Sequence, residues 1–193
     1  MPSNKFTLAV LASGNGTNAE EIFKYFGDHA AIEVGLLMTN NPKAFVVQRA
    51  KNYHVKSLVF NHQEFVEGSL IRQTLAENRI THIVLAGFLW LIPPYLLRSF
   101  PGRIINIHPA LLPKYGGKGM YGSKVHEAVK AAGDLETGIT IHLVNDHYDE
   151  GEILFQESCP ITENHTPDQI AECVHKLEHQ HYPRVIEQWV LNQ

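Results

Sequence analysis

Cysteine is scarce in this chain of 193 residues, which holds only Cys159 and Cys173. The two lie in different segments, and neither has the C-x-x-C spacing that is typical of structural zinc sites. So few cysteines without a recurring spacing are typical of proteins from a reducing compartment. The sequence therefore predicts a reducing, cytoplasmic setting and no structural zinc.

Long apolar runs and an excess of basic residues are missing as well. No run approaches the ~18 apolar residues of a membrane-spanning helix, and the short N-terminal run ends in glycines without the layout of a signal peptide. The formal net charge is −4, whereas general nucleic-acid binding needs a basic surface. We expect a soluble protein that acts on small molecules, as a monomer or homodimer, with neither nucleic acid nor a membrane as partner.

Recognisable metal-binding patterns are not evident, although there are twelve histidines. None of them falls in an H-E-x-x-H motif. Since scattered histidines are seldom metal ligands, the sequence predicts no metal cofactor.

Residues 6–107 alternate short apolar strands with amphipathic helices. Strands are expected at 6–12, 32–38, 56–60, 82–88 and 103–107, and helices at 18–26, 43–53, 62–78 and 93–99. Such alternation predicts a doubly wound, mostly parallel α/β sheet with helices on both faces.

The second half departs from this rhythm. A helix is expected at 123–132, and two strands at 138–144 and 152–159 bring the sheet to about seven. The last helix starts after Thr166, because T-P-D-Q combines a capping box with proline at the first helical position. Pro183 is expected to interrupt it. With no repeat or linker in sight, we expect one domain spanning 1–193.

A glycine-rich turn follows the first strand. Gly14, Gly16 and Ala19 fit G-x-G-x-x-G/A, in which backbone N–H groups approach a phosphate at a helix N-terminus. A dinucleotide site would also need an acid at the end of the second strand, which instead reads TNN at 39–41. The turn therefore favours a phosphate or mononucleotide over NAD, with a purely structural turn as the alternative.

Asn106 and His108 end the fifth strand, where ligands of parallel sheets bind. Being two residues apart on an extended segment, their side chains face the same side. An amide and an imidazole together can stabilise an oxyanion and move a proton. A polar strand end with no catalytic role is the alternative. An acid from the turn 146–151, which holds Asp146 and Asp149, would raise the pKa of His108.

Several blocks together resemble the folate-dependent formyltransferase superfamily, and most of all its members that act on glycinamide ribonucleotide. The blocks cover most of the chain: SGNGTN (13–18), LAGFLWLIPP (85–94), NIHPALLPKY (106–115), TGITIHLVNDHYDEG (137–151), ILFQ (153–156) and LEHQHYP (177–183). The resemblance implies a single formyltransferase domain with a Rossmann-like phosphate-binding half at 1–100 and a folate-binding, catalytic half at 101–193.

This resemblance also implies the activity and its residues. The formyl group of 10-formyltetrahydrofolate, a co-substrate, would pass to the amine of phosphoribosylglycinamide in purine biosynthesis, with a charged His108 at the centre. The implied roles are catalysis by Asn106, His108 and Asp149; substrate binding by Gly16, Thr17, Asn18, Glu178 and His175; folate binding by Leu89, Trp90, Leu91, Ile92, Asn106, Asp146 and Asp149; and support of the 146–151 loop by His142.

The chain departs from familiar members at three places, namely Trp90 (usually Arg), His175 (usually Gln) and a longer glycine-rich segment at 116–122. The alternatives are a 10-formyltetrahydrofolate hydrolase, which would carry a further N-terminal domain, and a methionyl-tRNA formyltransferase, which would carry a C-terminal RNA-binding domain. From other classes, a nucleotide-binding oxidoreductase and a non-catalytic nucleotide-binding module remain open.

Overall fold

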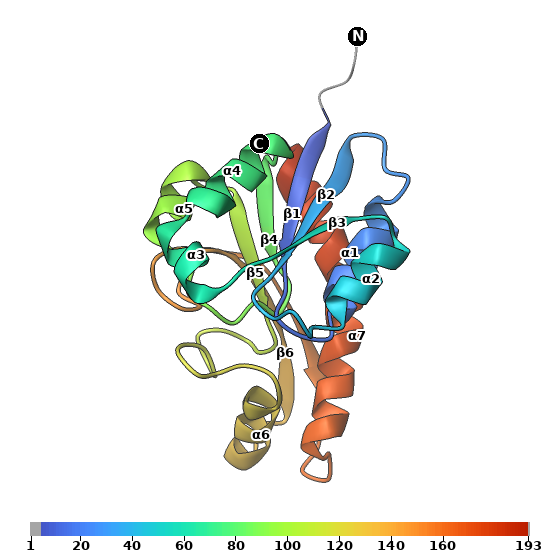
Figure 1. Ribbon diagram of the computed structural model, residues 1–193. Helices are drawn as coiled ribbons and strands as arrows, with labels where there is room; N and C mark the ends of the chain where they lie inside the picture. Colours follow the sequence, from blue (N-terminus) through green and yellow to red (C-terminus); the bar gives the residue numbers. More distant parts are fainter. Residues whose placement is uncertain (1–4, 193) are drawn as a thin grey trace.

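A seven-stranded mixed sheet forms the centre of the protein in the computed structural model, which describes residues 5–192. The strand order is β3-β2-β1-β4-β5-β6-β7 (Figure 1). Neighbouring strands from β3 to β5 are parallel, whereas β6 is antiparallel to both of its neighbours, β5 and β7. The strands are β1 (Phe6–Leu11), β2 (Ile32–Thr39), β3 (Lys56–Val59), β4 (His82–Leu85), β5 (Ile104–His108), β6 (Glu136–Leu143) and β7 (Ile153–Pro160).

Helices cover both faces of this sheet, as the sequence predicts. They are α1 (Thr17–Phe26), α2 (Val46–Asn52), α3 (His62–Glu67), α4 (Ser69–Glu77), α5 (Pro94–Ser99), α6 (Ser123–Ala132) and α7 (Pro167–Leu191). Side chains of β1 alternate between the two cores: Leu8 and Val10 pack with α1, α2 and α7, and Ala9 and Leu11 pack with α3, α4 and α5. The centre of the sheet, at β1 and β4, is therefore buried on both faces, whereas β3 and β7 are largely exposed.

The reversal of strand order places a crevice at the centre of the sheet. β1 lies between β2 and β4, so the chain leaves β1 toward one side and β4 toward the other. Open α/β sheets bind ligands at such a switch point, outside the carboxyl ends of the strands. The crevice between the ends of β1 and β4 is therefore the expected place for a ligand.

The expected helix at 62–78 is in fact two helices that meet at Gly68. This residue has φ 73°, and a Cβ on it would lie 2.5 Å from the ring of Tyr95. Asn61 and Glu64 form a capping box at the start of α3. The prediction of one helix was wrong because Gly68 takes a left-handed conformation against Tyr95.

Pro183 does not interrupt the last helix, contrary to the prediction. α7 runs from Pro167 to Leu191 and includes Pro183. Proline removes one helical hydrogen bond and costs about 3 kcal/mol in a helix interior. Burial of Tyr182, Ile186 and Val190 against the sheet offsets that cost, and Tyr182 also donates to the carbonyl of Leu85 at 2.8 Å.

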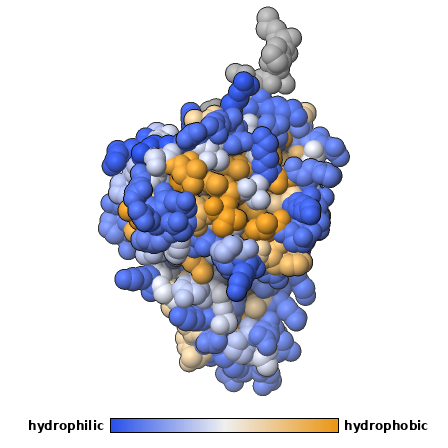
Figure 2. Space-filling model, viewed as in Figure 1, coloured by the Kyte–Doolittle hydropathy of each residue, from blue (hydrophilic) through white to orange (hydrophobic). Residues whose placement is uncertain are grey.

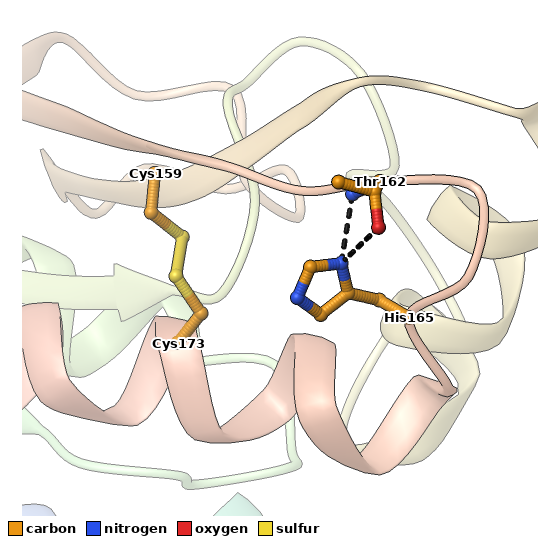
Figure 3. The surroundings of a disulfide bond; sticks show 4 residues. All are labelled: Cys159, Thr162, His165 and Cys173. Carbon is orange, nitrogen blue, oxygen red and sulfur yellow. Dashed lines mark hydrogen bonds between the residues drawn. A yellow bond between two sulfur atoms is a disulfide. The ribbon is translucent and has the colours of Figure 1, made fainter.

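The two cysteines are joined in a disulfide, which the sequence reasoning did not anticipate. Cys159 lies near the end of β7 and Cys173 on α7, with a Cα–Cα distance of 6.6 Å (Figure 3). Between them the chain turns through Thr162 and His165, where the Thr162 N–H donates to His165 Nδ1 at 2.8 Å. This turn folds α7 back beside β7 and so brings the two cysteines together.

Apolar side chains also gather on the surface, over the β3 edge of the sheet (Figure 2). No helix between residues 5 and 192 is long and apolar enough to cross a membrane.

Candidate active site

A cavity of about 730 Å³ opens at the carboxyl ends of β1, β4 and β5. Its size lies within the range of small-molecule sites, roughly 300–1,000 Å³. The predicted site residues that line it are Gly16, Thr17, Asn18, Leu89, Trp90, Leu91, Ile92, Asn106, His108, His142, Asp149, His175 and Glu178. Asp146 does not line it, because its exposed carboxylate turns to His147 Nδ1 at 3.0 Å.

The side chains of Asn106 and His108 point to the same side at the end of β5, where both contact Asp149. Asp149 Oδ2 lies 3.4 Å from His108 Nδ1, and Oδ1 lies 3.4 Å from Asn106 Nδ2. Asp149 has φ 58°, a left-handed conformation that is uncommon for a residue with a side chain. The loop after β6 thus brings a carboxylate to two residues some forty positions earlier, which spacing alone did not reveal.

His142 completes this cluster from the neighbouring strand. β5 and β6 pair antiparallel with Asn106 opposite His142. His142 Nδ1 lies 2.8 Å from the Leu143 carbonyl, which only accepts, so that nitrogen carries a proton. In the neutral ring, Nε2 then accepts from Asn106 Nδ2 at 3.2 Å. The Asn106 side-chain amide therefore donates one hydrogen bond to His142 and one to Asp149.

Two backbone groups that the sequence reasoning missed hold the cluster in place. His108 Nε2 donates to the Tyr115 carbonyl at 2.8 Å, and the Gly117 N–H donates to Asp149 Oδ2 at 3.0 Å. Both belong to the segment that follows β5. Backbone groups carry no signal of this kind in a sequence, so only the fold reveals them.

Burial controls the protonation of His108. It lowers the pKa of this ring, and the opposing effects of the Asp149 charge and of the Tyr115 carbonyl do not restore it. The adjacent acid Asp149 does raise the pKa, as expected, but burial outweighs it, so the net shift in the ligand-free protein is downward. For Asp149, burial would raise the pKa, but the neighbouring His142 and His108 rings and the Gly117 N–H outweigh it and lower the pKa.

Thr140 is a further missed residue, and it anchors the chain just after His108. It lies opposite His108 on β6 and is fully buried. Its hydroxyl donates to the Ala110 carbonyl at 2.7 Å and accepts from the Leu112 N–H at 3.0 Å. Gln156 Nε2 also donates to it, at 2.8 Å. This network fixes the exit from β5.

The glycine turn lies across the cavity and is clamped by α2. Gly16 has φ 76°, and a Cβ there would come within 2.3 Å of Val46. The Val46 N–H donates to the Gly14 carbonyl at 3.2 Å. Arg49 donates to both the carbonyl and the side-chain oxygen of Asn15 at 2.9 Å, and it pairs with Glu20. The turn is thus held with its backbone open to the cavity.

Asn18 and Glu178, which were both expected to bind the substrate, are in direct contact with each other. Asn18 Nδ2 donates to Glu178 Oε2 at 3.0 Å. Glu178 is 5% exposed, and this burial raises the pKa of its carboxyl to about 7 despite the Asn18 hydrogen bond. The Asn18 side-chain oxygen is buried without a partner among the described residues.

The spacing H-x-x-E-H at His175, Glu178 and His179 was overlooked in the sequence. The rings of His175 and His179 stack with centroids 6.3 Å apart. Within residues 5–192, no three His, Cys, Asp or Glu side chains are placed to hold a metal ion. His175 instead lies beside His126 of α6, with ring centroids 6.4 Å apart.

Residues 89–92, which follow β4, include both exposed and buried side chains. Leu89 and Leu91 are 44% and 41% exposed, whereas Ile92 is buried. Trp90 packs against Phe60, Phe65 and Phe88. All four line the cavity and give it an apolar surface, and the Leu89 N–H donates to the Ser13 hydroxyl at 3.2 Å.

Comparisons with known proteins agree with this geometry. The formyl transferase family model matches residues 6–186. Phosphoribosylglycinamide formyltransferase of Bacillus subtilis is 37% identical over 93% of this chain and 92% of its own length. The chloroplastic enzyme of that name from Arabidopsis thaliana is 40% identical over 93% of this chain, which spans only 63% of the plant protein.

Solved structures give the same result. The glycinamide ribonucleotide transformylase 1 of Geobacillus kaustophilus superimposes with a TM-score of 0.85 at 34% identity, over 94% of this chain and 97% of the other. The match includes the antiparallel part of the sheet, since it covers nearly the whole chain. The chain belongs to the formyl transferase family and, within it, to the phosphoribosylglycinamide formyltransferases.

Proposed function

We propose that this protein transfers the formyl group of 10-formyltetrahydrofolate to the amine of phosphoribosylglycinamide, as one domain working on small molecules. The observation that carries the proposal is the cluster on a cavity wall in which Asp149 lies 3.4 Å from both Asn106 and His108. One sheet carries residues of both halves of the chain, which supports a single working unit. A cytoplasmic location stays a prediction.

The substrate amine attacks the formyl carbon and generates a tetrahedral intermediate with an oxyanion. Asn106 and His108 stabilise the oxyanion, once N–H groups now given to Asp149, His142 and the Tyr115 carbonyl turn to it. The oxyanion raises the pKa of His108, because a nearby negative charge favours imidazolium. This charge, rather than Asp149 alone, restores the protonated ring that catalysis requires.

Proton transfer completes the reaction. The amine loses a proton after attack, and the departing folate nitrogen gains one. Asp149 faces the cavity with a lowered pKa, so it is ionised and can hold the water that relays this proton. Breaking the bond between carbon and the folate nitrogen then yields the N-formyl product and tetrahydrofolate. The proposed steps use no metal, because the imidazolium supplies the positive charge.

In this proposal phosphoribosylglycinamide and the folate occupy different parts of the cavity. The N–H groups of Gly16, Thr17 and Asn18 at the start of α1 bind the phosphate, and Glu178 and His175 bind the ribose side. Leu89, Trp90, Leu91 and Ile92 contact the pterin of the folate. His142 orients Asn106.

A spectrophotometric transfer assay tests the proposal. The purified protein receives a 10-formylfolate analogue and phosphoribosylglycinamide, and each is omitted in turn. We expect loss of the formyl group from folate only when the amine is present. Deformylation without the amine would identify a hydrolase instead, and no deformylation at all would overturn the folate-dependent function.

A further inference from the structure

The segment 117–122, hereafter the rim segment, brings one lysine to the cavity. Gly117, Lys118, Gly119, Met120, Tyr121 and Gly122 all line it. Lys118 is the only lysine or arginine among the described lining residues, which include the ionised carboxylate of Asp149. A phosphate dianion placed there with no cation would meet negative charge, which is unfavourable at short range.

The ammonium group of Lys118 is free. Within residues 5–192 it makes no hydrogen bond or ion pair, whereas neighbouring lysines are engaged: Lys114 with Asp134, Lys124 with the ring of Tyr121, and Lys130 with the Glu163 carbonyl. An exposed lysine on a cavity wall with no protein partner can bind an anion without first breaking a contact.

Contacts at the two ends of the rim segment place it on the phosphate side of the cavity. At its start, the Gly117 N–H donates to Asp149 Oδ2 at 3.0 Å. Beyond its end, His126 of α6 lies against His175 of α7. One turn later on α7, Glu178 accepts from Asn18, next to the glycine turn. The segment therefore runs from the catalytic acid toward Asn18.

Unpaired polar atoms mark the same region. His126 is 4% exposed and lines the cavity, and its Nδ1 is buried without a partner among the described residues. The Asn18 side-chain oxygen is in the same condition. Buried polar atoms without partners are costly, so a water or a ligand is expected to satisfy each of these two atoms.

Three glycines give the rim segment a backbone that can change conformation easily. Gly117, Gly119 and Gly122 all have positive φ, and a Cβ on any of them would meet no atom within 4 Å. Glycine is therefore required there by backbone conformation and not by crowding. Only the Gly117 end is tied to the catalytic cluster.

We propose that Lys118 binds the substrate phosphate from the rim segment, opposite the N–H groups of Gly16, Thr17 and Asn18. This inference rests on the proposed function for the identity of the substrate, but it assigns a cation that the glycine turn lacks. Lys118 would be a binding residue and take no part in formyl transfer.

Binding of ribose 5-phosphate and ribose, measured by calorimetry at fixed ionic strength, tests it without catalysis. Lys118→Met should weaken ribose 5-phosphate binding about 10- to 100-fold, the usual scale for a charged hydrogen bond, and Lys118→Arg should retain most of it. Lys124→Met is the matched control, since it removes the same charge from the same region. It should bind as wild type does.

Unchanged binding by Lys118→Met, or equal loss in Lys124→Met, would overturn the inference. In the transfer assay, Lys118→Met should raise the KM for phosphoribosylglycinamide and leave kcat and the KM for the folate nearly unchanged. A rise confined to the folate KM would assign Lys118 to the folate and also overturn it. Failure of the proposed function would look different, because wild type would then transfer no formyl group at all.

Discussion

His108 and Asp149 form a pair in which burial and charge oppose each other. Their closest atoms, Nδ1 and Oδ2, are 3.4 Å apart, and the other ring nitrogen faces the Tyr115 carbonyl. Only an imidazolium can donate to both acceptors, yet burial lowers the pKa of the ring. In the ligand-free site burial therefore disfavours the imidazolium, whereas a developing oxyanion would favour it.

Asp149→Asn should move the pH dependence of kcat. Without the carboxylate charge, the pKa of His108 falls further, so the protonated ring is lost at a lower pH. We expect kcat to begin falling at a lower pH than in wild type. At pH 7, kcat of the variant should be at least about tenfold lower. Transfer rates between pH 5 and 9 measure this. A profile of unchanged shape would mean that Asp149 does not act through His108.

Loss of either oxyanion donor should reduce turnover with the fold intact. Removing one such donor typically costs roughly 10²–10³ in rate, and we expect at least that from Asn106→Ala and from His108→Ala. Saturating transfer assays give kcat, and circular dichroism checks folding. Near-normal turnover in either variant would show that its side chain is not an oxyanion donor.

Arg49 should act as a positioning residue for phosphate binding. It holds Asn15 through two hydrogen bonds and does not line the cavity. Arg49→Met should free the glycine turn and raise the KM for phosphoribosylglycinamide about tenfold, the loss of roughly one hydrogen bond to a charged group, with kcat little changed. The exposed Arg98 of α5 offers the control Arg98→Met, and equal KM values in the two variants would refute this role.

Glu178→Gln should change how stability depends on pH. The carboxyl holds its proton more tightly in the folded protein, with a pKa of about 7, than at its ordinary value of 4.5. Its stabilising effect is full below pH 4.5 and is lost as pH rises toward 7, by about 3 kcal/mol in the free energy of unfolding. Relative to wild type, Glu178→Gln should therefore gain stability between pH 4.5 and 8.

Urea unfolding at several pH values measures that difference. Glu172→Gln, on the exposed side of the same helix, should show no such gain. A constant difference between Glu178→Gln and wild type across this range would contradict the raised pKa. The same variant should bind substrate more weakly, since glutamine lacks the charge.

Thr140→Val should destabilise the protein and disturb catalysis together. The change keeps the shape but removes the hydroxyl, leaving the Leu112 N–H and the Ala110 carbonyl without it in a buried site. The free energy of unfolding should fall by about 1–3 kcal/mol, and kcat should fall because the chain after His108 loosens. Ser158→Ala, at an exposed position of β7, should change neither quantity. A stable, fully active Thr140→Val would refute the anchoring role.

The sequence by itself determined the strand and helix order, the glycine turn and the strand end at Asn106 and His108. These are local features: apolar periodicity, capping residues such as Thr166, and glycine at a position like Gly16 that no side chain fits. The split at Gly68 was missed because it depends on the ring of Tyr95, which is distant in sequence. The continuity of α7 through Pro183 was missed because packing outweighed a local preference.

Only the tertiary structure decided which groups meet and in which direction their pKa values shift. Asp149 reaches His108 because β6 runs antiparallel to β5 and its loop returns over the strand end. The lowered pKa of His108, the raised pKa of Glu178 and the pairing of Cys159 with Cys173 all follow from burial and from chain folding. Desolvation depends on every neighbour around a group, and adjacency in sequence records few of them.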